Sequence, residues 1–188
     1  MGRAHNQRSD QGLDGLAERA AAFVAASDER AIREFNARYL VAIDDSQLES
    51  LEIVTPFRRA VQAILLDSGA SSQPASVALR ALLPHAGRVS VILHLRFAPQ
   101  NLMVGMPAYT LVVHKPFGPA TRIDPVEVQR VPRSILGDPV PPGTPVLRGT
   151  VEAIFDASRI GRKGNVAVGV YLDGHEIRRI PIDLGPLA

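Results

Sequence analysis

The stretch Arg88–Phe97, RVSVILHLRF, decides the fold, because the spacing of apolar residues changes there from helical to alternating. Every second residue of this stretch is apolar: Val89, Val91, Leu93, Leu95 and Phe97. The residues between them are Ser90, Ile92, His94 and Arg96, most of which are polar. A period of two predicts a β-strand with one strongly apolar face. Helical spacing precedes this stretch and further strand patterns follow it, so we predict an α+β fold.

The residues before this strand are predicted to form a disordered tail over 1–11 and a helical region of four to five helices over 12–87. The first helix is indicated by apolar residues at steps of three and four: Leu13, Leu16, Ala17, Ala20, Phe23 and Val24. Ser27 is expected to cap a second helix from Asp28 to about Ala42. Its buried residues are expected to be Ala31, Ile32, Phe35 and Tyr39.

Three further helices are predicted from capping signals. Ser46-Gln-Leu-Glu49 has the form of a capping box, which predicts a short helix over Gln47–Val54. Thr55-Pro56 supplies a cap and a first-turn proline for the next helix, and Gly69 is expected to end it. The last helix is expected over Pro74–Leu83, before Pro84 and Gly87.

The residues after the strand, over 88–188, predict an antiparallel β-sandwich, either immunoglobulin-like or a small barrel. Strand patterns recur over 108–114, 126–131, 146–155, 165–172 and 175–182. Asp173-Gly174 lies between the last two strands and predicts a tight hairpin turn with positive φ at both positions. Pro181 has no N–H to donate, so we expect the last strand to lie at a sheet edge.

Composition narrows the classes of protein to consider. Hydrophobic residues make up 46% and charged residues 21% of the 188 residues, which is typical of a globular chain. The chain has no cysteine, which excludes disulfides and thiolate metal ligands. No apolar run approaches the roughly 20 residues that span a membrane, and the N-terminus has no signal-peptide pattern, so a cytoplasmic protein is expected.

The charge and aromatic content give no sign of a nucleic-acid partner. The formal net charge is only +2, and aromatic residues amount to 5% with no tryptophan. A stacking platform for single-stranded nucleic acid is hard to build from so few rings. We therefore expect no nucleic-acid partner and no membrane partner.

One loop stands out as a candidate ligand site, the segment Asp156–Gly161, DASRIG. This segment resembles the DxSxxG element of PilZ domains, which implies binding of cyclic di-GMP through Asp156, Ser158 and Gly161. The sequence departs from that family in two ways. The family's upstream RxxxR is replaced by RxxR at Arg130 and Arg133, and only 27 residues follow Gly161.

The same loop also has the composition of an anion site. Arg159, Arg162 and Lys163 surround Gly161 and Gly164, and glycines allow backbone N–H groups to approach an anion. The alternative is a solvated loop whose basic residues discourage pairing with other strands.

The histidines offer another alternative, a metal site. His94 and His114 fall on consecutive predicted strands, and if these strands pair, both rings would project from one face. Two imidazoles do not complete a zinc site, and no HxH or HExxH spacing occurs. We therefore predict no metal and no cofactor, and no catalytic residues are assigned.

These observations favour a non-enzymatic protein-binding or assembly module that acts as an accessory subunit of a larger complex or self-associates. The alternative is a sensing domain that binds a cyclic dinucleotide or nucleotide through the Arg159–Gly164 loop. The expected ligand contacts are then Asp156, Ser158, Arg159, Gly161, Arg162 and Lys163.

Overall fold

The structure is a computed structural model that describes residues 3–67, 73–98, 105–116, 121–133, 143, 145–161 and 164–185, with side chains from residue 12 onward. The chain forms an α+β fold with two antiparallel sheets, as the sequence predicts. It divides into two compact units. We call Met1–Ala37 with Val54–Arg88 the helical unit, and Arg38–Ile53 with Val89–Ala188 the strand unit.

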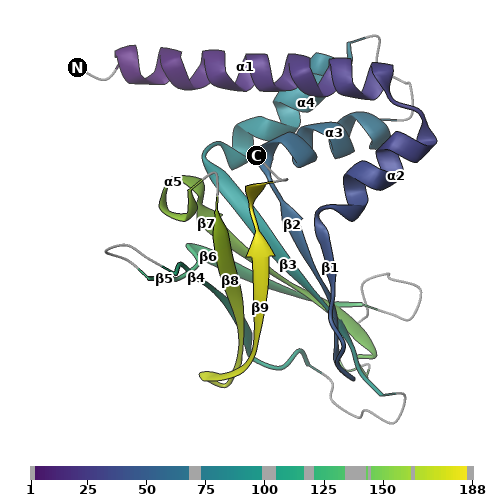
Figure 1. Cartoon of the computed structure of the whole chain (residues 1–188), viewed down its shortest axis with the longest axis vertical. Coiled ribbons are helices and arrows are strands. Elements are labelled where there is room, and N and C mark those ends of the chain that lie inside the picture. Colours follow the sequence, from purple (N-terminus) through teal and green to yellow (C-terminus); the bar gives the residue numbers. More distant parts are fainter. Residues whose placement is uncertain are drawn as a thin grey trace. The chain divides into compact units, whose positions relative to one another are not determined.

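The helical unit is built from α1 (Arg3–Ala26), α2 (Glu29–Ala37), α3 (Pro56–Leu66), α4 (Pro74–Leu82) and the 3₁₀ turn η1 (Leu83–His85). Helices α1, α3 and α4 pack against one another (Figure 1). Three rings from α1, α2 and α3 meet with centroids 4.8–6.0 Å apart: Phe23, Phe35 and Phe57. The predicted apolar stripe of α1 is confirmed as its inner face, since Ala17 and Ala20 are buried.

Helix α1 begins much earlier than predicted. It runs from Arg3, whereas residues 1–11 were expected to be a disordered tail. Residues 3–11 have no apolar stripe, which is why the sequence pattern gave no helix there. Extending an existing helix costs far less than nucleating one, so a polar segment can continue a helix that tertiary packing has already formed.

Helix α2 is shorter than predicted and has a different cap. Asp28, and not Ser27, caps it, because the Asp28 carboxylate accepts a hydrogen bond of 2.8 Å from the Ala31 N–H. The helix ends at Ala37, and the chain continues as strand β1 (Leu40–Ala42). The run Tyr39–Ile43 consists mostly of aromatic, β-branched and other apolar residues that suit a pleated surface. The prediction of helix as far as Ala42 is therefore wrong.

The helix predicted over Gln47–Val54 is also wrong, because these residues form strand β2 (Leu48–Val54). The Ser46–Glu49 capping box is not used. Instead, the Asp45 carboxylate accepts hydrogen bonds from the N–H groups of Gln47 (2.8 Å) and Leu48 (3.1 Å), which fixes the turn between β1 and β2. Strand pairing with β1 and β3 has overridden a local helix signal.

The strand unit contains a five-stranded sheet in the order β1-β2-β3-β7-β6 and a four-stranded sheet in the order β5-β4-β8-β9. Beyond β1 and β2, the strands are β3 (Arg88–Arg96), β4 (Tyr109–His114), β5 (Arg122–Ile123), β6 (Glu127–Arg133), β7 (Arg148–Asp156), β8 (Asn165–Leu172) and β9 (His175–Asp183). The predicted strands β3, β4, β6, β7, β8 and β9 are confirmed, whereas the two-residue β5 was missed. Buried residues of both sheets form the core of this unit, including Leu93, Val151, Leu111 and Val168.

The hairpin of β8 and β9 forms as predicted (Figure 1). Asp173 and Gly174 both have positive φ, 50° and 84°. Strand β9 is the last strand of its sheet, which confirms the edge position inferred from Pro181. The register shifts by one residue because Arg178 pairs with Val170 and Glu176 pairs with Tyr171, leaving Ile177 as a β-bulge.

Among the residues that the structure describes, we found no helix with both the length and the apolar character needed to cross a membrane.

Candidate functional site

The DxSxxG segment forms a tight, self-capped turn. Strand β7 ends at Asp156, and the short helix α5 (Ala157–Ile160) follows it. One Asp156 oxygen accepts hydrogen bonds from the hydroxyl (2.7 Å) and the N–H (2.8 Å) of Ser158, which together lower the pKa of the Asp156 carboxyl. This carboxylate therefore already occupies an N–H group that an incoming anion would need.

The glycines of the loop serve its backbone path. Gly161 has a φ of +90° and Gly164 a φ of +102°, a region that side-chain-bearing residues rarely adopt. The Gly161 N–H donates to the Ala157 carbonyl at 3.2 Å, so it too is satisfied within the turn. Two of the six predicted ligand contacts, Arg162 and Lys163, lie outside the described residues.

A cation that the sequence did not predict lies beside this loop. The Lys115 ammonium, just after β4, donates a hydrogen bond of 2.9 Å to the carbonyl of Arg159. Lys115 and Arg159 are 44 positions apart in the chain, so only the fold brings them together. The loop thus gains a positive charge from a second segment.

Arg130, the first arginine of the RxxR segment, forms hydrogen bonds within the fold. Arg130 on β6 donates from Nε to the Tyr109 carbonyl (2.9 Å) and from a terminal nitrogen to the Thr110 hydroxyl (3.4 Å). Strand β5 pairs only with the far end of β4, at Val113 and His114. The Arg130 side chain therefore links β6 to the part of β4 that β5 leaves uncovered.

The two histidines considered for a shared metal lie in different sheets. His94 on β3 bonds Glu52 on β2 at 2.9 Å, whereas His114 on β4 contacts residues of the other sheet. A shared metal site required both rings to lie on one pair of neighbouring strands. The structure instead places His94 and His114 in different sheets. Within the described parts of the chain, no cluster of three or more His, Asp or Glu side chains is suited to a metal.

A polar cluster that sequence reasoning missed lies on the outer face of the four-stranded sheet; it comprises Arg122, His114, Tyr171, Glu176 and Arg179. Residues that alternate with them, such as Val113, Val168 and Ile180, are buried. Register explains the gathering, because Arg122 pairs with His114, and Tyr171 pairs with Glu176. We refer to these five residues as the outer-face cluster.

Hydrogen bonds connect the outer-face cluster in a chain. The Tyr171 hydroxyl donates to Glu176 Oε2 at 2.7 Å and lies 3.2 Å from His114 Nε2. Arg179 donates one hydrogen bond of 2.7 Å to each Glu176 carboxylate oxygen. The Arg122 guanidinium lies 5.4 Å from the centre of the Tyr171 ring. Two of these side chains are mostly shielded from solvent, because His114 is 17% and Glu176 28% exposed.

This environment changes the acidity of the cluster. The hydrogen bonds from Arg179 and Tyr171 lower the pKa of Glu176 to about 2. The bond to Glu176 raises the pKa of Tyr171, whereas partial burial and the nearby Arg179 charge lower the pKa of His114. At neutral pH the cluster therefore holds a neutral imidazole, a neutral phenol and a carboxylate.

Gly169 makes the cluster sterically possible. A Cβ on Gly169 would lie 2.8 Å from Tyr171 Cε2 and 2.9 Å from His114 Nε2. Only glycine leaves the space that lets the two rings lie over β8. Their centroids are 6.3 Å apart with planes inclined by 28°.

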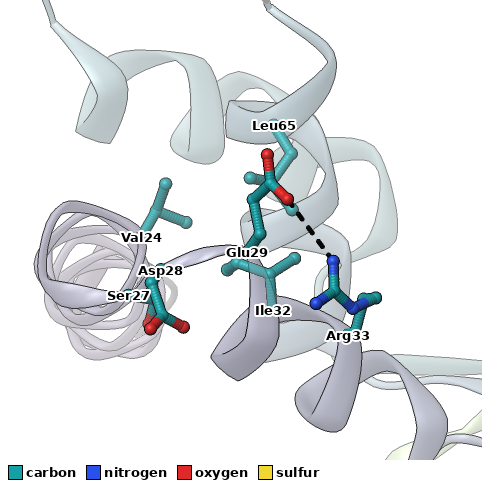
Figure 2. Close-up of a pocket in the computed structure, with 7 residues that line it drawn as sticks. All are labelled: Val24, Ser27, Asp28, Glu29, Ile32, Arg33 and Leu65. Carbon is teal, nitrogen blue, oxygen red and sulfur yellow. Dashed lines mark hydrogen bonds and ion pairs between the residues drawn. The ribbon is translucent and has the colours of Figure 1, made fainter.

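The helical unit carries a groove between α1, α2 and the end of α3. Its volume is about 410 Å³, and its lining residues are Val24, Ser27, Asp28, Glu29, Ile32, Arg33 and Leu65. Figure 2 shows Val24 pointing from α1 towards Ile32 and Leu65, with the ion pair of Glu29 and Arg33 beside them. The groove thus combines apolar side chains with a charged rim.

The comparisons with known proteins give no guide to function. No family model matches the chain, and no curated protein or solved structure is significantly similar to it. Function must therefore be inferred from the side chains themselves, because a fold alone does not define an activity.

Proposed function

We propose that this chain is a non-enzymatic assembly module, a subunit of a larger complex, whose helical unit pairs with a second copy through the groove between α1, α2 and α3. The observation that carries this proposal is the open apolar lining of that groove, formed by Val24, Ile32 and Leu65.

Exposed leucines strengthen the proposal. Leu65 is 37% exposed, and the next residue, Leu66, is 83% exposed. Fully burying one leucine side chain stabilises a protein by about 1.5–3 kcal/mol, so most of Leu66 and about a third of Leu65 remain as unused stabilisation. Neighbouring apolar residues on a surface are a common feature of protein–protein interfaces.

The charges on α2 favour a second copy as the occupant. Glu29 and Arg33 lie one helical turn apart, with side chains 95% and 70% exposed and their charged atoms 3.4 Å apart. Ile32 lies between them in the sequence. If two α2 helices meet antiparallel across a two-fold axis, Glu29 of each copy faces Arg33 of the other around a central pair of Ile32 residues.

The test is the mass of the purified chain by light scattering over a range of concentrations. We expect a monomer–dimer equilibrium that Ile32→Asp weakens at least tenfold, whereas Ile177→Asp, at an exposed isoleucine of the strand unit, leaves it unchanged. Circular dichroism of both variants checks that they fold. A monomer at every concentration, or a dimer that Ile32→Asp leaves intact, would overturn the proposal.

Charge reversal tests the antiparallel arrangement directly. Glu29→Arg and Arg33→Glu should each weaken self-association, because like charges then face each other across the two-fold axis. Mixing the two variants should restore association, since each then offers the charge that the other lacks. If mixing restores nothing, α2 does not pair in this way. If Ile32→Asp instead abolishes binding of a different protein by a monomeric chain, the groove holds another partner and the second copy is excluded.

A second candidate, favoured by the position of Lys115, is a sensing function in which the Arg159–Gly164 loop binds a phosphorylated ligand. Lys115 adds a charge to Arg159 at this loop. A ligand at a hundred times its dissociation constant adds about 2.7 kcal/mol of stability, which thermal denaturation detects easily. The panel is cyclic dinucleotides, nucleotides and sulfate, with Arg159→Ala as the control. No shift with any compound would exclude this function.

A further inference from the structure

Three different donor atoms of the outer-face cluster meet at the spacing of ligands around a metal ion. The Tyr171 hydroxyl lies 3.2 Å from His114 Nε2 and 2.7 Å from Glu176 Oε2, and these last two atoms are 3.9 Å apart. The point equidistant from these three atoms lies about 2.0 Å from each of them, which is the distance between Zn²⁺ and its nitrogen and oxygen ligands. We propose that His114, Tyr171 and Glu176 bind a divalent transition-metal ion.

The donor chemistry fits an ion that accepts mixed nitrogen and oxygen ligands. Imidazole suits zinc, copper, iron and nickel, and a carboxylate adds a charged oxygen. When the metal binds, the Tyr171 oxygen exchanges its proton for the ion, so one proton leaves for each ion bound. The phenolate and the carboxylate together carry two negative charges, which balance a divalent cation with a neutral imidazole.

The surroundings allow this exchange. Arg179 donates to both Glu176 oxygens at 2.7 Å, from Nε to Oε1 and from a terminal nitrogen to Oε2, so metal binding requires Oε2 to exchange its hydrogen bonds from Arg179 and Tyr171 for the ion. The bond from Nε to Oε1 can remain and hold the carboxylate in place, as outer-shell partners do. The positive charge of Arg122 is paired with Asp124 at 2.9 Å. His114 and Glu176 retain 17% and 28% of their exposure, which leaves a path for an ion from solvent. Gly169 keeps the space beneath the two rings open.

The site was not visible in the sequence for two reasons. Tyrosine is not among the usual residues of a zinc motif, and the three donors come from β4, β8 and β9 with no characteristic spacing. This proposal is independent of the assembly function, because every ligand belongs to the strand unit.

The test uses the full chain without a histidine tag, titrated by calorimetry with Zn²⁺ and with Cu²⁺. We expect one ion per chain, micromolar or tighter binding that is stronger for Cu²⁺, and release of one proton, measured in buffers of different ionisation enthalpy. Cu²⁺ should also produce a visible charge-transfer band from the Tyr171 phenolate. Calorimetry without binding of either ion would overturn the proposal.

Variants separate this site from an adventitious surface histidine. Tyr171→Phe keeps the ring but removes the donor oxygen, so it should abolish the charge-transfer band and the proton release and weaken binding at least tenfold. His114→Gln should also weaken it at least tenfold. The matched control is His94→Gln, which removes a histidine that also bonds a glutamate but lies in the other sheet. Binding that His94→Gln reduces, or that Tyr171→Phe leaves unchanged, would refute the assignment.

Discussion

Replacing Gly169 by alanine should destabilise the strand unit, although a Gly-to-Ala change within a strand normally has a small favourable effect. The added Cβ would lie 2.8 Å from Tyr171 and 2.9 Å from His114, closer than such atoms approach in proteins. Overpacking of this kind costs about 1–3 kcal/mol. Both neighbours can turn outward to relieve part of the clash, so we expect the middle of this range, about 2 kcal/mol. The backbone gain of about 0.5–1 kcal/mol offsets part of it.

The outcome is a loss of roughly 1 kcal/mol in the free energy of unfolding, measured by urea denaturation with circular dichroism. Two controls accompany it. Gly12→Ala in α1 has nothing within 4 Å of the new Cβ and should stabilise the helical unit by about 0.5–1 kcal/mol. Gly105→Ala, likewise uncrowded but in the strand unit, should have little effect.

A second measurement on the same variant separates the cluster from general packing. Once displaced into water, the His114 ring should titrate closer to its ordinary pKa of 6.5, whereas in the wild type its pKa lies below that value. Nuclear magnetic resonance of the ring protons follows this change. A Gly169→Ala protein as stable as the wild type, with an unchanged His114 titration, would refute our account of why this position is glycine.

Three further outcomes follow from other contacts. The pKa of His114 is lowered in the folded state, so its contribution to stability is complete above pH 6.5. This contribution declines as the pH falls below 6.5 and through the lower folded-state pKa. His114→Gln should therefore flatten the stability–pH curve below pH 6.5. Gly149→Ala should cost about 1 kcal/mol or less, because its Cβ would overlap the flexible end of the Met106 side chain, which can move aside, and adding Met106→Ala should remove that clash. Thr55 caps α3 by accepting a hydrogen bond from the Arg58 N–H at 3.3 Å, so Thr55→Ala should lower the thermal midpoint by the equivalent of about 1 kcal/mol, whereas Thr55→Ser should not.

The elements that sequence patterns predicted well are those whose signals depend on neighbouring residues. The alternation over Arg88–Phe97, the Thr55-Pro56 cap and the Asp173-Gly174 turn each specify a local backbone geometry, and each formed as predicted. The helix predicted over Gln47–Val54 failed because long-range pairing opposed a local signal. Leu48–Val54 has a capping box before it, yet strand partners on both sides made it β2.

The candidate sites show the same division. The turn at Asp156 and Ser158 was found because its residues lie close together in the sequence. Its hydrogen bonds show that these two residues stabilise the turn itself. The outer-face cluster was missed because His114 and Tyr171 are 57 positions apart and meet only through strand register. Lys115 beside Arg159 was missed for the same reason.

The bulge at Ile177 has a consequence for how the protein behaves at high concentration. A long, regular edge strand is a template on which other chains add, and such addition leads to ribbons and fibrils. In β9 the extra residue interrupts the ladder, Pro181 removes a donor, and charged side chains line the strand at Glu176, Arg178 and Arg179. Deleting Ile177 would restore an even ladder, and such a chain should aggregate into thioflavin-positive material where the parent protein stays in solution.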